Sequence, residues 1–142
     1  MTEESAAPPP DYRPSPDEPY MNPRQLAYFR QKLLDWRASL LAEERDDLRH
    51  LREAAQELSD VVDRATQESE HAFELRVRER HRKLIQQIDE ALRRIDDGSY
   101  GYCEDTGEEI GLARLEARPT ASLCLEAQEK RERQAGLFHR EP

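Results

Sequence analysis

The feature that most constrains this chain is a pair of long amphipathic runs separated by a short break. The first run carries Leu26, Phe29, Leu33, Trp36, Leu40, Leu48, Leu51, Ala55 and Leu58. The second carries Phe73, Val77, Leu84, Ile88, Leu92 and Ile95. Spacings of three and four residues predict two helices, each with one apolar seam. Since the break at residues 59–65 is short, we expect an antiparallel coiled-coil hairpin over residues 22–97.

The expected ends of the hairpin carry residues that start and stop helices. Asn22 can cap the first turn, and Pro23 at the first helical position loses no hydrogen bond. Gly98 follows Asp96 and Asp97 and supplies the left-handed conformation that commonly ends a helix. At about 1.5 Å per residue, helices of this size predict a hairpin roughly 45 to 50 Å long.

Composition excludes several classes of protein. Charged residues make up 37% of the 142 residues, hydrophobic residues make up 36%, and mean hydropathy is -1.03, so one large globular core is not expected. The net charge of -9 argues against a protein that recognises a DNA sequence directly. No apolar run reaches the length of a membrane span, and no signal segment begins the chain. We therefore expect a cytoplasmic protein without membrane contact.

Two further regions flank the hairpin. Residues 1–21 are rich in proline and poor in aliphatic side chains, which predicts a flexible tail whose last residues, Tyr20 and Met21, pack on the folded part. Residues 98–142 contain turn signals, a hairpin at Asp105–Gly107, and a last helix capped by Thr120 or Ser122. The predicted fold class is mainly α, with the coiled-coil hairpin on a small globular domain that ends in a helix.

The two cysteines occupy half of a pattern that is typical of zinc sites. Cys103 and Thr106 stand where one Cys-x-x-Cys knuckle would lie, and Cys124 and Ala127 stand where a second would lie. Neither threonine nor alanine can replace a thiolate ligand of zinc. We therefore predict a degenerate zinc-finger-like segment without a bound metal. A reversible disulfide between the two thiols, and completion of a site by Glu104, Asp105 or His139, remain open alternatives.

The break between the helices holds two carboxylates three residues apart, Asp60 and Asp63. Carboxylates at the end of a long hairpin lie far from any core, which favours their presentation to a partner over a role in stability. The capping of the second helix by Asp63 is compatible with that interpretation. The four histidines are scattered, and no serine or cysteine has a recognisable base, so we predict that the chain is not an enzyme.

Short segments of specific sequence are spread along residues 20–135. They are Tyr20-Met21-Asn22, Gln25-Leu26, Phe29-Arg30, Asp60 to Ala65, Gly101-Tyr102-Cys103, Leu115 to Thr120, and Leu123-Cys124. Together these segments resemble the DksA family (DksA/TraR), whose members are bacterial transcription factors that bind RNA polymerase, and the resemblance covers nearly all of residues 20–135. It implies a coiled coil that enters the secondary channel of the polymerase and modulates open-complex stability during initiation.

The resemblance also implies roles for individual residues. Asp60, Asp63 and Ala65 match the functional tip residues of the family, although Val61 stands where a proline is expected. Arg80, in a basic stretch at residues 76–83, matches a contact with an acidic rim of the channel. Taken alone, that stretch is more typical of a solvated helix face than of a binding site.

Family members also act with the alarmone ppGpp in the stringent response. Arg118 matches one of the basic groups that hold ppGpp, whereas two expected lysines are Gln87 and Gln128 here. Neutral amides lose the charge-assisted bonds that hold a polyphosphate. We therefore expect a weakened ppGpp response, unless Lys83 or Lys130 compensates.

Two other functions fit parts of the sequence. In a Gre-like factor, the tip carboxylates would hold a magnesium ion and stimulate transcript cleavage by the polymerase. In a structural or adaptor coiled coil, the tip residues would have no special role. We expect a monomer whose main partner is RNA polymerase.

Overall fold

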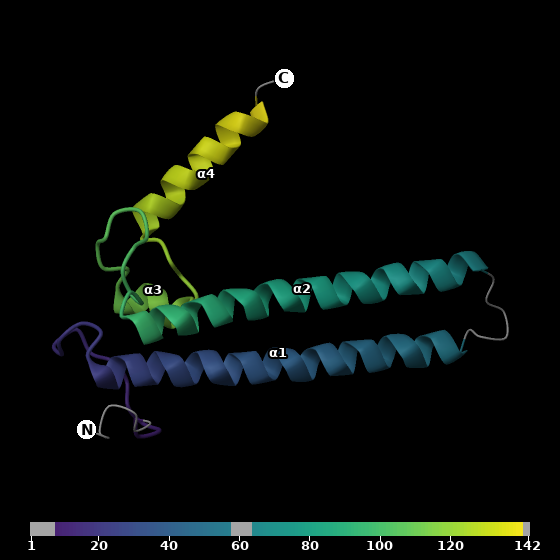
Figure 1. Ribbon diagram of the computed structural model, residues 1–142, viewed down its shortest axis with the longest axis horizontal. Coiled ribbons are helices and arrows are strands. Elements are labelled where there is room, and N and C mark those ends of the chain that lie inside the picture. The colour runs from purple at the N-terminus through teal and green to yellow at the C-terminus, as the bar shows by residue number, and fades with distance from the viewer. Residues whose placement is uncertain (1–7, 58–63, 141–142) are drawn as a thin grey trace. The chain divides into compact units, whose positions relative to one another are not determined.

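The computed structural model describes residues 8–57 and 64–140 (Figure 1). The described residues form helices α1 (Pro23–Glu57), α2 (Arg64–Asp97), α3 (Leu112–Ala117) and α4 (Leu125–Arg140). The chain divides into two compact units: unit 1 comprises residues 1–33 and 89–142, and unit 2 comprises residues 34–88. None of the described helices has both the length and the apolar character needed to cross a membrane.

The predicted start of α1 and the predicted end of α2 are confirmed. The Oδ1 atom of Asn22 accepts a hydrogen bond of 3.0 Å from the backbone N–H of Gln25, so Asn22 caps α1 and Pro23 begins it. At the end of α2, the backbone N–H groups of Ser99 and Tyr100 donate to the carbonyl of Arg94 at 3.0 and 3.1 Å. These bonds close the helix because Gly98 adopts a left-handed conformation with φ 85°.

In unit 2, α1 and α2 run antiparallel and lie side by side (Figure 1). Arg52 of α1 lies 3.7 Å from Glu74 of α2, whereas Arg80, further along α2, lies 3.6 Å from Asp47, further back on α1. The two helices contain 35 and 34 residues, which corresponds to lengths of roughly 50 Å each. The predicted fold class, a mainly helical chain with a long antiparallel helix pair and a C-terminal helix, is confirmed.

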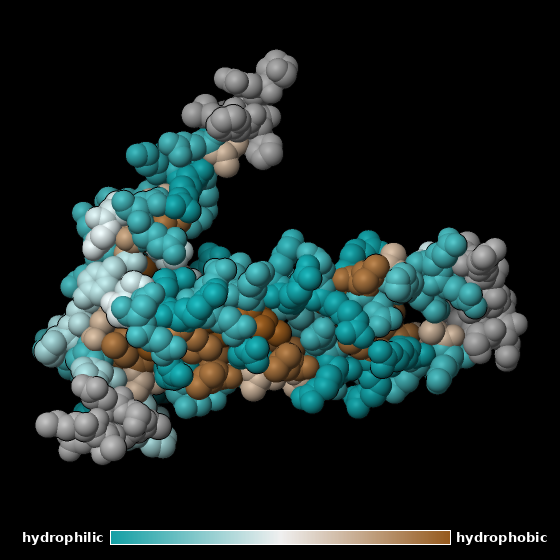
Figure 2. All heavy atoms as spheres, viewed as in Figure 1, coloured by the Kyte–Doolittle hydropathy of each residue, from teal (hydrophilic) through white to brown (hydrophobic). Residues whose placement is uncertain are grey.

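The predicted seam of α2 is wrong at Phe73, whose side chain is 54% exposed. The ring of Phe73 instead lies under the guanidinium of Arg76, 4.5 Å from the ring centroid. His81, which was not predicted to belong to the seam, is only 2% exposed. It lies between Val77 and Leu84 at helical spacing and therefore completes the seam. Figure 2 shows brown apolar residues in patches along the paired helices, among teal hydrophilic ones.

The core of unit 1 surrounds Tyr100, which follows the end of α2. Its ring centroid lies 5.7 Å from that of Phe29 on α1, and its hydroxyl donates a hydrogen bond of 2.7 Å to the carbonyl of Pro119. The other fully buried large side chains of unit 1 are Leu33, Leu115 and Gln25. Each fully buried apolar side chain stabilises the unit by about 1.5 to 3 kcal/mol.

The last helix begins later than predicted. Thr120 and Ser122 precede α4 and do not cap it, because the helix begins at Leu125 and the backbone N–H of Gln128 donates to the carbonyl of Cys124 at 3.0 Å. Capping potential alone could not locate this start, since residues 118–124 are held by tertiary contacts. Ala127 is buried, whereas Leu125 is 57% exposed.

Candidate functional site

The predicted tip falls mostly outside the described residues. Asp60 and Asp63 belong to residues 58–63, which the structure does not describe. The backbone of Ala65 lies in the first turn of α2, which begins at Arg64. The roles of these three residues therefore stay predictions.

The finger segment begins with the hairpin predicted at Asp105–Gly107, which is confirmed. The backbone N–H of Cys103 donates to the carbonyl of Glu108, and that of Ile110 donates to the carbonyl of Gly101, both at 2.8 Å. At the turn, the N–H of Gly107 donates to the carbonyl of Cys103 at 2.9 Å. Gly107 permits this turn because its φ is 75°.

The hairpin brings three of the four remnant zinc-site positions together. The hydroxyl of Thr106 lies 3.9 Å from the sulfur of Cys124 and also forms a hydrogen bond with Cys103. The backbone N–H of Glu104 donates to the carbonyl of Ser122 at 2.9 Å, which holds the hairpin beside Cys124. The fourth position, Ala127, is buried in the first turn of α4.

The thiol of Cys103 lies among hydrogen-bond donors. Burial alone would raise its pKa. Hydrogen bonds from the Thr106 side chain and from the backbone of Cys124, Thr106 and Asp105 outweigh that effect and lower the pKa to about 7. Backbone N–H groups that surround a sulfur in this way stabilise a thiolate without a metal.

The donor set does not fit a structural zinc ion. Such sites use four thiolate or imidazole ligands, whereas these positions supply two sulfurs, one hydroxyl and one methyl group. Within residues 8–57 and 64–140, no three His, Cys, Asp or Glu side chains gather as a metal site would require. Asp105 is engaged elsewhere, since it accepts a hydrogen bond of 2.9 Å from the Nε of Arg131.

Arg80, the predicted rim residue, lies on α2 in unit 2 with a side chain 69% exposed. Its guanidinium lies 3.6 Å from the carboxylate of Asp47 on α1. The same carboxylate oxygen lies 3.7 Å from the Nε2 of His81. The other ring nitrogen of His81 lies 2.8 Å from the carbonyl of Val77. His81 was missed by the sequence analysis, although its position at helical spacing between Val77 and Leu84 indicated a place in the seam.

Arg118, the predicted ppGpp-binding residue, lies directly after α3 in unit 1. Its backbone N–H donates to the carbonyl of Arg114 at 2.8 Å, and its side chain lines a groove of about 1100 Å³. Pro14, Tyr20, Ile110 and Leu125 also line this groove. The Gln128 amide, which replaces an expected lysine, donates to Glu132 at 3.0 Å.

Comparison with known sequences identifies the family. Residues 25–95, half of the chain, match the family described as "DnaK suppressor protein DksA, N-terminal domain". The "RNA polymerase-binding transcription factor DksA" of Caulobacter vibrioides is 61% identical over 123 residues, which cover 87% of each chain. The chain belongs to the DksA family. The DksA protein of Escherichia coli K12 is 49% identical over 115 residues, covering 81% of this chain and 76% of that protein.

A solved structure and a second family match extend the comparison beyond residues 25–95. The structure of transcription factor DksA2 from Pseudomonas aeruginosa has a TM-score of 0.68 and 42% identity, covering 82% of this chain and 89% of that chain. Residues 98–133 match the family described as "Prokaryotic dksA/traR C4-type zinc finger". This DksA-family chain has cysteine at two of the four remnant positions, so its finger departs from the C4 description.

Proposed function

We propose that this chain binds RNA polymerase and regulates transcription. The observation that carries the proposal is its 61% identity, over 87% of both chains, to a relative named an RNA polymerase-binding transcription factor. The long antiparallel helix pair supports it, because a hairpin roughly 50 Å long can enter a narrow channel. The protein then shifts a conformational equilibrium of the polymerase and performs no chemistry itself.

Asp60, Asp63 and Ala65 are the tip residues that act inside the secondary channel. Two carboxylates at the end of a paired helix can compete for polar contacts made by mobile elements of the polymerase. A ligand of this kind changes open-complex stability only by binding one state of the polymerase more tightly than another. The proposal for these residues rests on their match to the family pattern, on the position of Asp60 and Asp63 between α1 and α2, and on that of Ala65 in the first turn of α2.

Arg80 contacts an acidic rim of the same channel. Its exposure supports this role, and its ion pair with Asp47 is weak enough to be exchanged for another carboxylate. A contact of this kind speeds association and orients the hairpin more than it raises affinity.

Arg118 is the residue for a ppGpp contact, and this role rests on its match to the family pattern. With Gln87 and Gln128 in place of lysines, the contact has fewer charge-assisted bonds. We therefore infer a transcription factor whose ppGpp response is weak. Zinc is no cofactor of this finger, because two of the four positions carry no ligand.

The tip is tested with Asp63→Asn in an in vitro assay of promoter-complex lifetime, at a promoter with an unstable open complex. We expect the unaltered protein to change the lifetime and Asp63→Asn to lose most of that change. The matched control is Asp46→Asn, which makes the same substitution at an exposed α1 residue paired with Arg49 at 3.3 Å. If both variants changed the promoter-complex lifetime as much as the unaltered protein does, the result would support the adaptor alternative.

A second assay separates the proposal from the Gre-like alternative. Stalled elongation complexes are incubated with the protein and magnesium, and the RNA is followed for shortening at its 3′ end. We expect no shortening, because no magnesium is held by the tip in the proposed mechanism. Shortened RNA that disappears with Asp60→Asn would establish the Gre-like function instead.

A further inference from the structure

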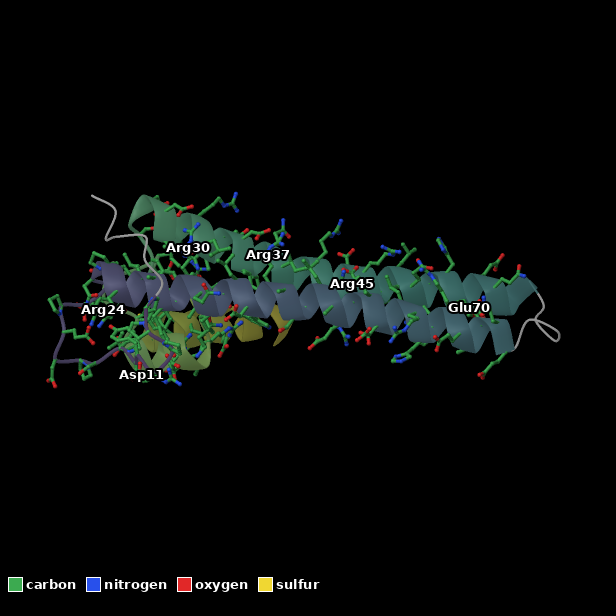
Figure 3. The ribbon with its side chains drawn as sticks, turned by 90° about the horizontal axis from the view of Figure 1, so that it is seen from below. Asp11, Arg24, Arg30, Arg37, Arg45 and Glu70 are labelled. Atoms are coloured by element: carbon green, nitrogen blue, oxygen red, sulfur yellow. The ribbon has the colours of Figure 1, made fainter. Side chains whose placement is uncertain are left out.

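Residues 9–22 precede α1 and form a folded segment, which we call the N-terminal strap, although most of them were predicted to belong to a flexible tail. Three backbone hydrogen bonds close turns in it: Tyr12 to Pro9 at 2.9 Å, Glu18 to Ser15 at 3.1 Å, and Asn22 to Pro19 at 3.3 Å. The hydroxyl of Tyr12 donates to Glu18 at 2.8 Å. Figure 3 labels Asp11 of the strap and Arg24 of α1, and the guanidinium of Arg24 lies 5.4 Å from the ring centroid of Tyr12 in the strap.

One side chain of the strap joins the two ends of the finger hairpin. The hydroxyl of Tyr20 donates to the carbonyl of Gly101 at 2.7 Å and accepts from the backbone N–H of Gly111 at 3.0 Å. Gly101 precedes the first side of the hairpin, and Gly111 follows the second. The Tyr20 ring also packs edge-on against the Tyr102 ring, with centroids 5.5 Å apart. A single residue, distant in sequence, therefore bridges both sides of the hairpin.

The next residue of the strap fills the space beside Gly101. A Cβ atom at Gly101 would lie 2.8 Å from the Cγ and 2.9 Å from the Sδ of Met21, too close for any real contact. Met21 is itself fixed, because its N–H donates a buried hydrogen bond of 2.8 Å to the Oε1 of Gln25 on α1. Its φ of 53° is unusual for a residue with a side chain, so surrounding contacts must hold it.

We propose that Tyr20 positions the finger hairpin, residues 101–111, through the paired hydrogen bonds of its hydroxyl. The strap is then a structural part of unit 1, although residues 9–22 precede both family matches, which cover 25–95 and 98–133. In a finger that has two thiols in place of four, this bridge restrains the hairpin without a metal. The inference concerns the folded chain alone and does not depend on polymerase binding.

The test is amide hydrogen exchange of the full-length protein, resolved at Gly111. Tyr20→Phe keeps the ring and removes only the hydroxyl, so the Gly111 N–H loses its acceptor, whereas the Gly101 carbonyl still accepts from Ile110. We expect exchange at Gly111 to become at least tenfold faster. The matched control, Tyr12→Phe, removes a hydroxyl that donates to Glu18 within the strap, and should leave Gly111 unchanged.

Amides of α1 in unit 2 serve as an internal reference. Under the proposal, their exchange is equal in the unaltered chain and in both variants, because the bridge acts only on unit 1. Equal exchange at Gly111 in Tyr20→Phe and Tyr12→Phe would overturn the proposal. Faster exchange throughout both units in Tyr20→Phe would also overturn it, since the hydroxyl would then support general stability and not the position of the hairpin.

Discussion

A double substitution, Thr106→Cys with Ala127→Cys, should convert the finger into a zinc site. The hydroxyl of Thr106 lies 3.9 Å from the Cys124 sulfur and helps to lower the pKa of the Cys103 thiol, so a sulfur in its place would lie near both thiols. Ala127 is buried one helical turn beyond Cys124. Four thiolates at these positions would meet the tetrahedral requirement of structural zinc.

The expected magnitude has two opposing parts. Without metal, the variant loses the Thr106 hydroxyl, which accepts from the N–H of Glu108 at 3.2 Å and contacts Cys124. Two such bonds contribute about 1 to 3 kcal/mol together, and a larger side chain at buried Ala127 costs about 1 to 3 kcal/mol. With free zinc a thousandfold above its Kd, binding returns about 4 kcal/mol.

The measurement is thermal unfolding followed by circular dichroism, with zinc and with a chelator. For the double variant, the difference of about 4 kcal/mol corresponds to a Tm shift on the order of 15 °C. The unaltered chain should show no difference between the two conditions. Metal content, measured after gel filtration, should be one zinc per double variant.

The result that would refute the reasoning is a folded double variant with the same Tm in zinc and in chelator. The four positions would then not surround one point. One zinc per unaltered chain would equally contradict the metal-free finger. The single variant Thr106→Cys is the control, since three thiolates should hold zinc more weakly than four.

Two further outcomes follow from the burial and charge of single residues. Because the folded pKa of Cys103, about 7, lies below the ordinary thiol value of about 8.5, the stability from its thiolate is complete above the ordinary value and is lost as pH falls through 7. The urea midpoint should therefore rise between about pH 6 and 9, and Cys103→Ser should remove that dependence; an unchanged rise would assign it to other groups. Phe29→Ala should lower stability by about 3 to 5 kcal/mol, whereas Phe73→Ala, at a side chain 54% exposed, should cost far less in the same denaturation; equal losses would contradict the assigned burial.

The sequence predicted those features that depend on neighbouring residues. Asn22 and Gly98 mark their helix boundaries because a cap and a left-handed residue act within one turn. The hairpin at Asp105–Gly107 was predicted for the same local reason. The incomplete finger was also visible, because ligand spacing is a property of the sequence.

Features that depend on distant contacts were not predictable in this way. Hydrophobicity places Phe73 in the seam and leaves out His81, yet Phe73 is exposed and His81 is buried, because burial depends on where α1 lies and not on the side chain alone. The Tyr20 hydroxyl joins residues 81 and 91 positions away. No local pattern marks such a bridge. The tip residues Asp60 and Asp63, although recognisable in the sequence, lie outside the described residues.

The distribution of buried side chains along unit 2 has a mechanical consequence. Leu40, Leu48, His81 and Ile88 are buried, whereas no described residue in 49–57 or 67–80 is. The free energy of local opening is larger where more side chains are buried. The helix pair therefore opens less readily around these four residues than in residues 49–57 and 67–80. Residues 49–57 and 67–80 can therefore adjust to the walls of a narrow channel, while the helices stay aligned where Leu40, Leu48, His81 and Ile88 are buried.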